Sequence, residues 1–273
     1  MKADLFHIGK FVVHGYGLMI GIGFVLALLV GEYRAKKMGM KEEAIVDIAI
    51  IAGVSGFLGA KLLYIIVNFK DFIKDPLGVL GSSGFVVYGG LIAGVLCNMI
   101  YVKIKKLSFF EYFDLVMPEI ALAQGFGRIG CFLAGCCYGR ETHAAWGVVF
   151  PENSLAPAGV KLIPTQLISS AADFLNMAFL MVIAAKFSYT AVKMRQKEGE
   201  ENIKHLAAGD IGFLYCITYG FGRFVIEFLR NDYRGEVGIF STSQFISLFI
   251  VLLGVVAIVV NHKRMKINKK QKF

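Results

Sequence analysis

The sequence predicts an all-α polytopic membrane protein with about seven transmembrane helices, an amino terminus outside the cell and a carboxyl terminus in the cytoplasm. Three observations lead to this fold class. The chain is 56% hydrophobic with a mean hydropathy of +0.64, and its charged residues, 18%, are too few to cover a soluble globule. Apolar runs of about 20 residues, the length that a membrane helix needs, recur along the chain. Basic residues gather in four tracts beside these runs.

Taken in order, the apolar runs predict helices over 11–31, 43–67, 84–103, 109–137, 164–187, 208–230 and 241–261. The first run resembles a secretory signal in following Lys2 and Lys10, but it is as long as a span and lacks a small-residue cleavage site. It is therefore expected to remain as the first helix. No internal repeat, low-complexity tract or composition shift divides the sequence, so residues 1–273 are expected to form a single membrane domain.

The basic tracts set the orientation, because positively charged loops stay in the cytoplasm. They follow the first, third, fifth and seventh runs: 34–41, 103–106, 193–204 and the tail 262–273. The segments near 68–83, 138–163 and 231–240 are then outside. An odd number of spans places the two termini on opposite sides, which agrees with an outside amino terminus and a cytoplasmic carboxyl terminus.

Composition also excludes several functions. A net charge of +9 could suggest nucleic acid, but the basic tracts adjoin apolar runs, where anionic lipid attracts them, so no nucleic-acid partner is expected. The five cysteines lack the spacing of secreted disulfides or zinc ribbons. Structural disulfides are not expected, and the adjacent Cys136 and Cys137 are interpreted as small packing residues rather than a redox pair.

Three early segments contain candidate residues. Tyr16 lies near the outer end of the first run, where a tyrosine is often an interfacial anchor. The second run has a ridge of Gly53, Gly56 and Gly59 before Lys61, which either extends to the outer interface or contacts phosphate. Tyr88 precedes two glycines at the depth where an outward-facing cavity would end.

The stretch QGFGRIGCFLAGCCYGR, residues 124–140, has an arginine inside an apolar segment. An arginine near a bilayer centre costs about 2.5–3.5 kcal/mol on insertion scales, so Arg128 should face a cavity, a partner or an anionic ligand. The five glycines of the stretch allow a helix or a head group to approach the backbone. The stretch is therefore interpreted as the floor of a site, with a structural cation paired to a buried carboxylate as the alternative.

The sixth run adds a polar stripe. At 100° per residue, Tyr219, Arg223, Glu227 and Arg230 fall on one helix face. Arg223 and Glu227 could neutralise each other at i, i+4, with Arg230 extending outward. Alternatively, at least one of the two membrane arginines is free to bind an anion, unless the acids at 114, 119 and 173 supply further counter-charges.

An ordered set of segments now becomes recognisable: HGYGLM, GAKLLY, YGGLIAG, GRIGCFLAGCCYG, PTQL at 164–167, YGFGRFVIEFLR and STSQ at 241–244. In this order, over nearly the whole chain, they resemble the prolipoprotein diacylglyceryl transferase family. The resemblance implies a multi-pass protein of the bacterial inner membrane with seven helices. It also implies transfer of the diacylglyceryl group from phosphatidylglycerol to the lipobox cysteine of preprolipoproteins, releasing glycerol phosphate, without a metal or organic cofactor.

Residue by residue, the resemblance assigns lipid binding and catalysis to Tyr16, Arg128, Gly139, Tyr219 and Arg223. The arginines are expected to hold the lipid phosphate, because a guanidinium binds phosphate through a fixed fork. The two tyrosines are expected to bind the head group. Supporting contacts are expected from four further residues: Lys61, Gln166, Glu227 and Arg230.

The sequence departs from the family pattern in three places. Best-known members have a histidine where this chain has Tyr88 and another where it has Ile163, and they have Asn and Glu where it has Cys131 and Cys136. Tyr88 is therefore assigned as proton acceptor or orienter, although a phenol with a pKa near 10 is a poor base. A phospholipid-dependent transferase with another acceptor, or a transporter-like protein, is the alternative.

Overall fold

The computed structural model describes residues 4–8, 11–152, 154–197, 199, 205–231 and 235–270. Its long helices are α1 (Gly15–Lys37), α2 (Glu43–Val67), α5 (Val87–Ile104), α6 (Phe109–Ala134), α7 (Thr165–Phe187), α9 (Asp210–Glu227) and α10 (Thr242–Lys270). Its short helices are α3 (Phe69–Lys74), α4 (Pro76–Gly81) and α8 (Tyr189–Lys197). Three antiparallel hairpins complete it: β1 (Asp4–Ile8) with β2 (Phe11–His14), β3 (Val148–Val149) with β4 (Lys161–Leu162), and β5 (Glu236–Val237) with β6 (Phe240–Ser241).

A long helix lies at each of the seven predicted positions, but the structure supports a smaller number of spans. Among the described residues, five helices are long and apolar enough to cross a membrane: α1, α2, α5, α7 together with α8, and α10. Helices α6 and α9 do not meet this standard, because they contain charged residues, among them Arg128 in α6 and Arg223 in α9. The chain is thus a polytopic, mostly helical membrane protein.

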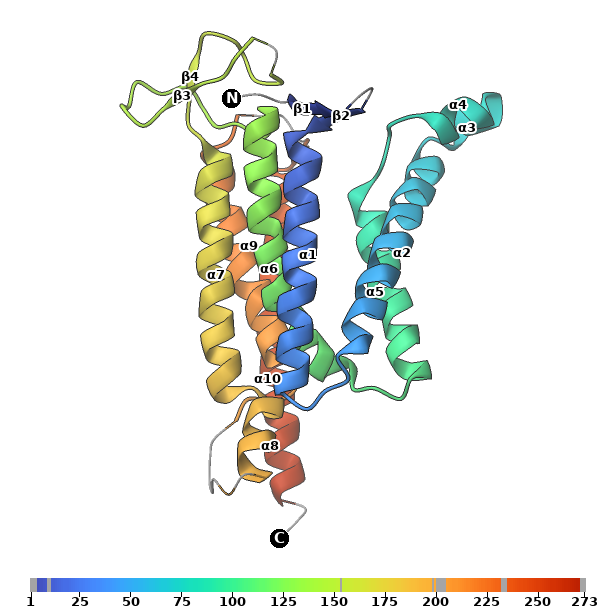
Figure 1. Cartoon of the computed structure of the whole chain (residues 1–273), viewed down its shortest axis with the longest axis vertical. Coiled ribbons are helices and arrows are strands. Elements are labelled where there is room, and N and C mark those ends of the chain that lie inside the picture. The colour runs from blue at the N-terminus through green and yellow to red at the C-terminus, as the bar shows by residue number, and fades with distance from the viewer. Residues whose placement is uncertain are drawn as a thin grey trace.

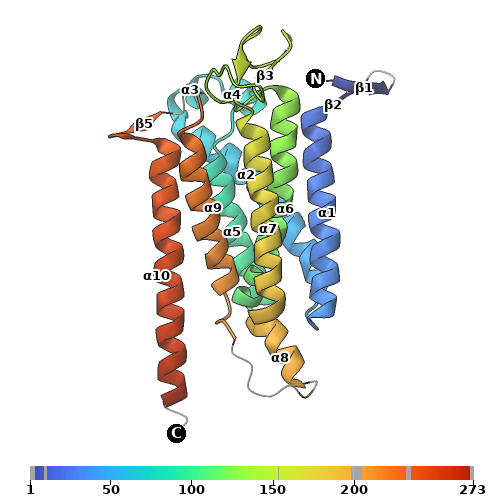
Figure 2. The same ribbon diagram turned by 90° about the vertical axis from the view of Figure 1, so that its left-hand side faces the viewer.

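Helices α1, α6, α7, α9 and α10 form the main bundle (Figures 1 and 2). Helix α6 packs between α1 and α7 and also contacts α9, and α9 packs against α10 and α7. The two helices that contain Arg128 and Arg223 therefore lie against several neighbours each. This position explains how their charged groups are kept from lipid.

Helices α2 and α5 form a hairpin beside this bundle and pack mainly against each other (Figure 1). The predicted glycine ridge explains their close contact. A Cβ atom added at Gly59 would lie 2.5 Å from the Gly89 carbonyl oxygen, and one at Gly89 would lie 2.3 Å from the Gly59 oxygen. The paired glycines bring the two backbones into direct contact.

Buried carboxylates connect the helices at the end of the bundle that holds α8 (Figure 1). Arg34 Nη1 of α1 donates to Glu119 Oε1 of α6 at 2.5 Å. Asp114 accepts hydrogen bonds from the backbone N–H groups of Gly209 and Gly212, at 2.7 and 3.0 Å, where α9 begins. These two acids, which the sequence left open as counter-charges for the membrane arginines, thus have structural partners of their own.

Candidate functional site

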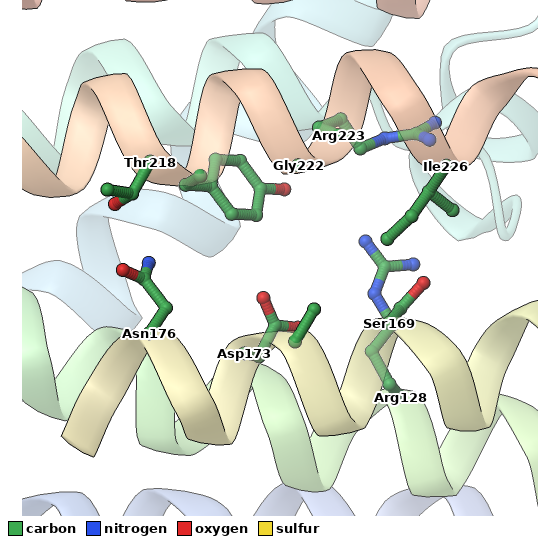
Figure 3. Close-up of a pocket in the computed structure, with 10 residues that line it drawn as sticks. Arg128, Ser169, Asp173, Asn176, Thr218, Gly222, Arg223 and Ile226 are labelled. Atoms are coloured by element: carbon green, nitrogen blue, oxygen red, sulfur yellow. The ribbon is translucent and has the colours of Figure 1, made fainter. Parts of the chain in front are cut away.

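A cavity of about 40 Å³ lies between α6, α7 and α9 (Figure 3). This volume holds about three waters. Polar side chains from all three helices face it, among them Arg128 of α6, Asp173 of α7, and Tyr219 and Arg223 of α9. The structure therefore brings together two predicted stretches that are about 90 residues apart in the sequence.

The Arg128 guanidinium enters the cavity from α6 (Figure 3). Among the described residues, no hydrogen bond or ion pair joins Arg128 to another side chain; its nearest opposing groups act only at longer range. A cation without a direct partner in a membrane helix is well suited to bind an anion. The alternative of a structural ion pair is therefore not supported for this residue.

Arg223 enters the same cavity from the opposite side (Figure 3), but it has close partners. Its Nη1 lies 2.5 Å from Glu227 Oε2, and its Nη2 donates to Ser243 Oγ of α10 at 3.0 Å. Ser241 in turn donates to Glu227 Oε1 at 3.0 Å. The i, i+4 pair that the sequence left open as one of two alternatives is formed, and α10 helps to hold it in place.

Glu227 also lies near Arg230, with 3.8 Å between Arg230 Nε and Glu227 Oε2. Arg230 is buried, in contrast to the outward extension considered from the sequence. Its backbone pairs with that of Gly139 in an isolated β-bridge. Arg230 thus links the end of α9 to the segment that follows α6.

Asp173 is the acid that faces the two arginines. It is 7% exposed, lines the cavity, and lies within range of the charges of Arg128 and Arg223. Among the described residues no side chain forms a hydrogen bond or ion pair with it. The cavity therefore contains two guanidinium groups, one of them paired with Glu227, and one carboxylate.

Tyr219 lines the cavity and stacks on Tyr215, with ring centroids 5.4 Å apart and planes 8° from parallel. The Tyr215 hydroxyl donates to Gln124 Oε1 at 2.7 Å, which joins α9 to α6. The stack holds the Tyr219 ring in position. Its phenol is available to a ligand in the cavity.

Tyr16 lies at the start of α1, beside the carboxyl-terminal part of α6. A Cβ atom added at Gly130 would lie 3.2 Å from the Tyr16 ring and 3.1 Å from its carbonyl oxygen, so Gly130 allows this close contact. The ring is 45% exposed. Tyr16 thus flanks Arg128 from the side of α1, although it does not line the cavity itself.

The segment after α6 is shaped by Gly135, which has φ 71° and ends the helix at Ala134. The predicted helix 109–137 was three residues too long, because a left-handed residue cannot continue a right-handed helix. Gln166 and Gly139 act on this segment. Gln166 Nε2 donates to the Cys136 carbonyl oxygen at 2.7 Å, and a Cβ atom at Gly139 would lie 2.7 Å from Ile163.

Lys61 and Tyr88 lie apart from this cavity, in the α2–α5 hairpin. Lys61 Nζ donates to the Ser82 carbonyl oxygen at 2.7 Å and lies over the Phe85 ring, so it holds the loop before α5. Tyr88 is 44% exposed at the start of α5. The structure therefore places the two arginines close to Tyr219 and Glu227. Lys61 and Tyr88 lie outside this group.

Sequence reasoning missed most of the polar lining that α7 supplies. Ser169, Asp173 and Asn176 line the cavity, and with Gln166 and Ser170 they form a polar stripe along one face of an otherwise apolar helix. The spacing i, i+3, i+4, i+7, i+10 was visible in the sequence. A search for polar periodicity within apolar runs would have found it.

The chain is similar to known proteins over nearly its full length. The model of the family described as prolipoprotein diacylglyceryl transferase matches residues 3–260. A phosphatidylglycerol–prolipoprotein diacylglyceryl transferase of Clostridium tetani is 44% identical, with 93% of this chain and 96% of the relative covered. The second such transferase of Clostridium perfringens is 42% identical, with 96% of both covered. A transferase of Clostridioides difficile is 31% identical over 93% of this chain and 92% of the relative. The chain belongs to the prolipoprotein diacylglyceryl transferase family.

Proposed function

We propose that this protein transfers the diacylglyceryl group of phosphatidylglycerol to the thiol of a prolipoprotein cysteine, and that Arg128 and Arg223 hold the lipid phosphate during the reaction. Relatives named for this reaction match nearly the full chain. The observation that carries the assignment of the arginines is the cavity that both of them line, with Arg128 lacking a close partner among the described residues.

The reaction is a displacement at the glycerol carbon that bears the phosphate ester. The sulfur forms a C–S bond, the C–O bond breaks, and the electron pair leaves with the phosphate of glycerol phosphate. Negative charge therefore grows on the phosphate oxygens in the transition state. Guanidinium groups stabilise that charge most strongly where water is scarce, as between α6 and α9.

The surrounding residues have distinct roles in this proposal. Tyr219 hydrogen-bonds the head group inside the cavity, and Tyr16 does so from α1. Asp173 balances the cationic charge until the phosphate arrives. Glu227 and Arg230 orient Arg223, while Gly139 and Gln166 shape the segment at the outer end of α6. Lys61 and Tyr88 would act on the incoming substrate from the α2–α5 hairpin, with Tyr88 as proton acceptor or orienter.

The same proposal places one membrane domain with seven spans in the bacterial inner membrane, its amino terminus outside. Helix α6 has 26 residues and α9 has 18, which correspond to about 39 and 27 Å of helix, close to or above the ~30 Å of a bilayer core. The basic ends of α1, α5 and α8 lie with the carboxyl terminus at one end of the molecule, as positive-inside topology requires (Figure 1).

The test is transfer by the purified protein in vesicles that contain phosphatidylglycerol with labelled acyl chains. A peptide with a lipobox cysteine should gain the mass of one diacylglyceryl group, and glycerol phosphate should appear in equal amount. A peptide with serine at that position, and vesicles with phosphatidylethanolamine instead, are the controls. Transfer to the serine peptide, or none to the cysteine peptide by a protein that melts cooperatively, would contradict the proposal.

A further inference from the structure

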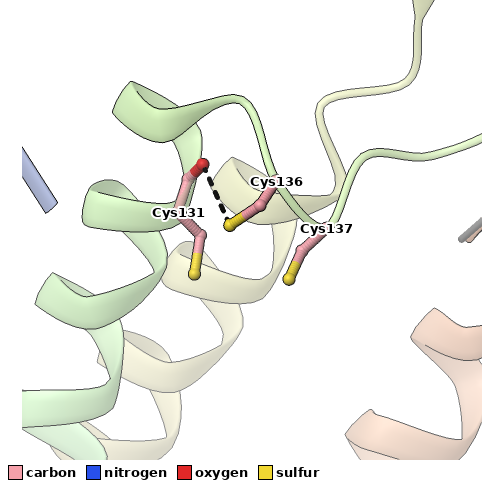
Figure 4. Close-up of side chains that lie close together, drawn as sticks. All are labelled: Cys131, Cys136 and Cys137. Carbon is pink, nitrogen blue, oxygen red and sulfur yellow. Dashed lines mark hydrogen bonds between the residues drawn. The ribbon is translucent and has the colours of Figure 1, made fainter. Parts of the chain in front are cut away.

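Three thiols meet at the outer end of α6. The Sγ atoms of Cys131, Cys136 and Cys137 all lie within 4.8 Å of one another (Figure 4). All three side chains are half-buried, and none forms a disulfide. The sequence had suggested that Cys136 and Cys137 are small packing residues, because they are adjacent in an apolar segment.

The backbone is built to hold these thiols together. Gly135 turns the chain with φ 71°, and the Cys136 N–H donates to the Cys131 carbonyl oxygen at 3.1 Å, which returns the chain over the last turn of α6. Cys137 is one of two described non-glycine residues with positive φ, at 62°. Such a backbone conformation costs about 1–3 kcal/mol, so the surrounding structure must impose it.

Two buried side chains of helix α7 impose this backbone conformation on the cysteine segment. Gln166 Nε2 donates to the Cys136 carbonyl oxygen at 2.7 Å, and Thr165 Oγ1 donates to the Cys137 carbonyl oxygen at 2.8 Å. Thr165 is 0% and Gln166 1% exposed. The positions of the two adjacent thiols are therefore fixed from outside their own segment.

Three sulfur ligands with an open side suit zinc. In a tetrahedral zinc site the Zn–S distance of about 2.3 Å places the sulfur atoms about 3.8 Å apart, so the thiols need to approach by about 1 Å at most. Structural zinc sites have four protein ligands, whereas catalytic sites have three and leave the fourth position for water or substrate. The half-burial of all three cysteines leaves such a side accessible.

The cluster is close to the residues that bind the lipid. Cys131 follows Arg128 by three residues on α6, a rise of about 4.5 Å, and the Arg128 charge acts on Cys131. Tyr16 is near all three thiols and Arg128. The Arg230 guanidinium hydrogen-bonds Cys137. These cations offset part of the negative charge of three thiolates.

We infer that Cys131, Cys136 and Cys137 together bind one Zn²⁺ ion, and that its fourth position takes the sulfur of the prolipoprotein cysteine as a thiolate. The inference rests on the proposed function and differs from the sequence-based expectation that no metal is bound. It also accounts for the departures from the family pattern: the chain has Tyr88 and Ile163 where the family has histidines, and a metal removes the need for a base.

With zinc bound, the reaction balances without a catalytic base, so that Tyr88 serves as the orienter of the substrate and not as the proton acceptor. The substrate thiol loses its proton to water as its sulfur binds Zn²⁺, which is not oxidised or reduced. The coordinated thiolate attacks the glycerol carbon, the C–S bond forms, and the C–O electron pair leaves with glycerol phosphate. The thioether product is neutral, binds zinc weakly and is replaced by water. A free cysteine is only about 3% thiolate at pH 7, so complete ionisation gives about a 30-fold larger reactive fraction.

Metal content is the first test. The full-length protein, purified in detergent without chelators, should contain one zinc per chain, and the single variants Cys131→Ala, Cys136→Ala and Cys137→Ala should lose it. The matched controls are Cys97→Ala and Cys216→Ala, which remove thiols outside the cluster and should keep zinc and activity. Zinc in equal amount in all five variants would overturn the inference.

The second test determines whether the substrate sulfur is the fourth ligand of the metal. Protein reloaded with Co²⁺ should show a thiolate-to-cobalt charge-transfer band and the strong visible bands of a tetrahedral site. A lipobox peptide with cysteine should strengthen the charge-transfer band, and the same peptide with serine should not. An unchanged spectrum with the cysteine peptide would show that the substrate sulfur does not bind the metal.

The third test measures the activity of the wild-type protein, so that it does not depend on variants that fail to fold. Removal of zinc from the wild-type protein with a chelator should reduce transfer to the lipobox peptide at least tenfold at pH 7, and added Zn²⁺ should restore it. The loss should shrink at pH 9, where a free thiol ionises by itself. Equal transfer with and without zinc would overturn this inference and leave the proposed function intact, whereas no transfer by the zinc-loaded protein would overturn the proposed function.

Discussion

At the scale of single residues, the two membrane arginines differ in their surroundings. Arg128 has no close partner among the described residues, while Arg223 is held by Glu227 and Ser243. The sequence offered Glu227 as a partner for Arg223 but left open whether the pair forms, because spacing allows a contact without showing that it is made. The structure assigns Glu227 to Arg223.

This difference predicts different responses to substitution. Arg128→Lys should lose about 100-fold or more in transfer while the protein keeps its melting temperature, because an ammonium cannot form the bidentate fork to phosphate. Arg223→Ala should lose activity and also about 3 kcal/mol of stability, because the buried Glu227 loses its closest cation and keeps only Arg230, 3.8 Å away, and the Ser241 hydroxyl. Transfer kinetics and melting in detergent measure both effects. Near-normal activity of a stable Arg128→Lys protein would remove Arg128 from the site.

Asp173 provides a second prediction at this scale. Asp173→Asn removes a negative charge from a cavity that binds a phosphate, so KM for phosphatidylglycerol should fall, by about 5–30-fold if the charge acts at 1–2 kcal/mol. The matched variant Asn176→Asp adds a charge to the same lining and should raise KM. A large loss of kcat in Asp173→Asn with KM unchanged would instead assign this carboxylate to the chemical step.

At the scale of helices, glycine positions decide which elements can touch. In the α2–α5 hairpin, Gly59 and Gly89 face each other across backbone contacts, whereas a Cβ atom at Gly53 would meet nothing within 4 Å. The sequence showed a ridge of equally spaced glycines. It could not show which of them lies at the contact.

The packing of the hairpin therefore predicts that the same change, glycine to alanine, affects stability differently at two positions. Gly89→Ala should destabilise the protein by about 1–3 kcal/mol, because the new methyl group would lie 2.3 Å from a carbonyl oxygen that cannot rotate away. Gly53→Ala should be neutral or slightly stabilising, since alanine favours the helix. Thermal unfolding in detergent compares the two. Equal stability of both variants would mean that the hairpin does not pack as the structure shows.

At the scale of the whole molecule, the two ends of the bundle differ. The three hairpins lie at one end, and α8 and the carboxyl terminus lie at the other (Figures 1 and 2). Hydropathy alone identifies five spans among the described residues. Helices α6 and α9 contain more charged groups inside their apolar runs and are counted as spans only in the proposal. They can lie in the membrane because neighbouring helices cover their charged groups.

Seven spans with the amino terminus outside predict the accessibility of two loops. An epitope tag next to Leu155, which is 74% exposed between α6 and α7, should be reached by antibody in intact spheroplasts. A tag after Lys197, at the end of α8, should be reached only after the membrane is opened. The neighbouring Asn153 lies outside the described residues. Protection of the Leu155 tag would reject both the orientation and the count.

The sequence by itself determined the class of protein, the positions of seven long helices and the two stretches that carry Arg128 and Arg223. These properties depend on local composition, on a helical period of 3.6 residues and on motif order, all of which can be read from neighbouring residues. The end of α6 was misplaced by three residues because a left-handed turn at Gly135 outweighs the apolar run.

Only the tertiary structure decided which charges are paired and which thiols meet. Asp114 and Glu119 have partners in α9 and α1, which leaves Asp173 facing the arginines. The three cysteines converge because Gly135 reverses the chain and α7 holds the reversed segment through Thr165 and Gln166. Such arrangements depend on distant contacts and on backbone angles at single residues, and hydropathy or periodicity contains no information on either.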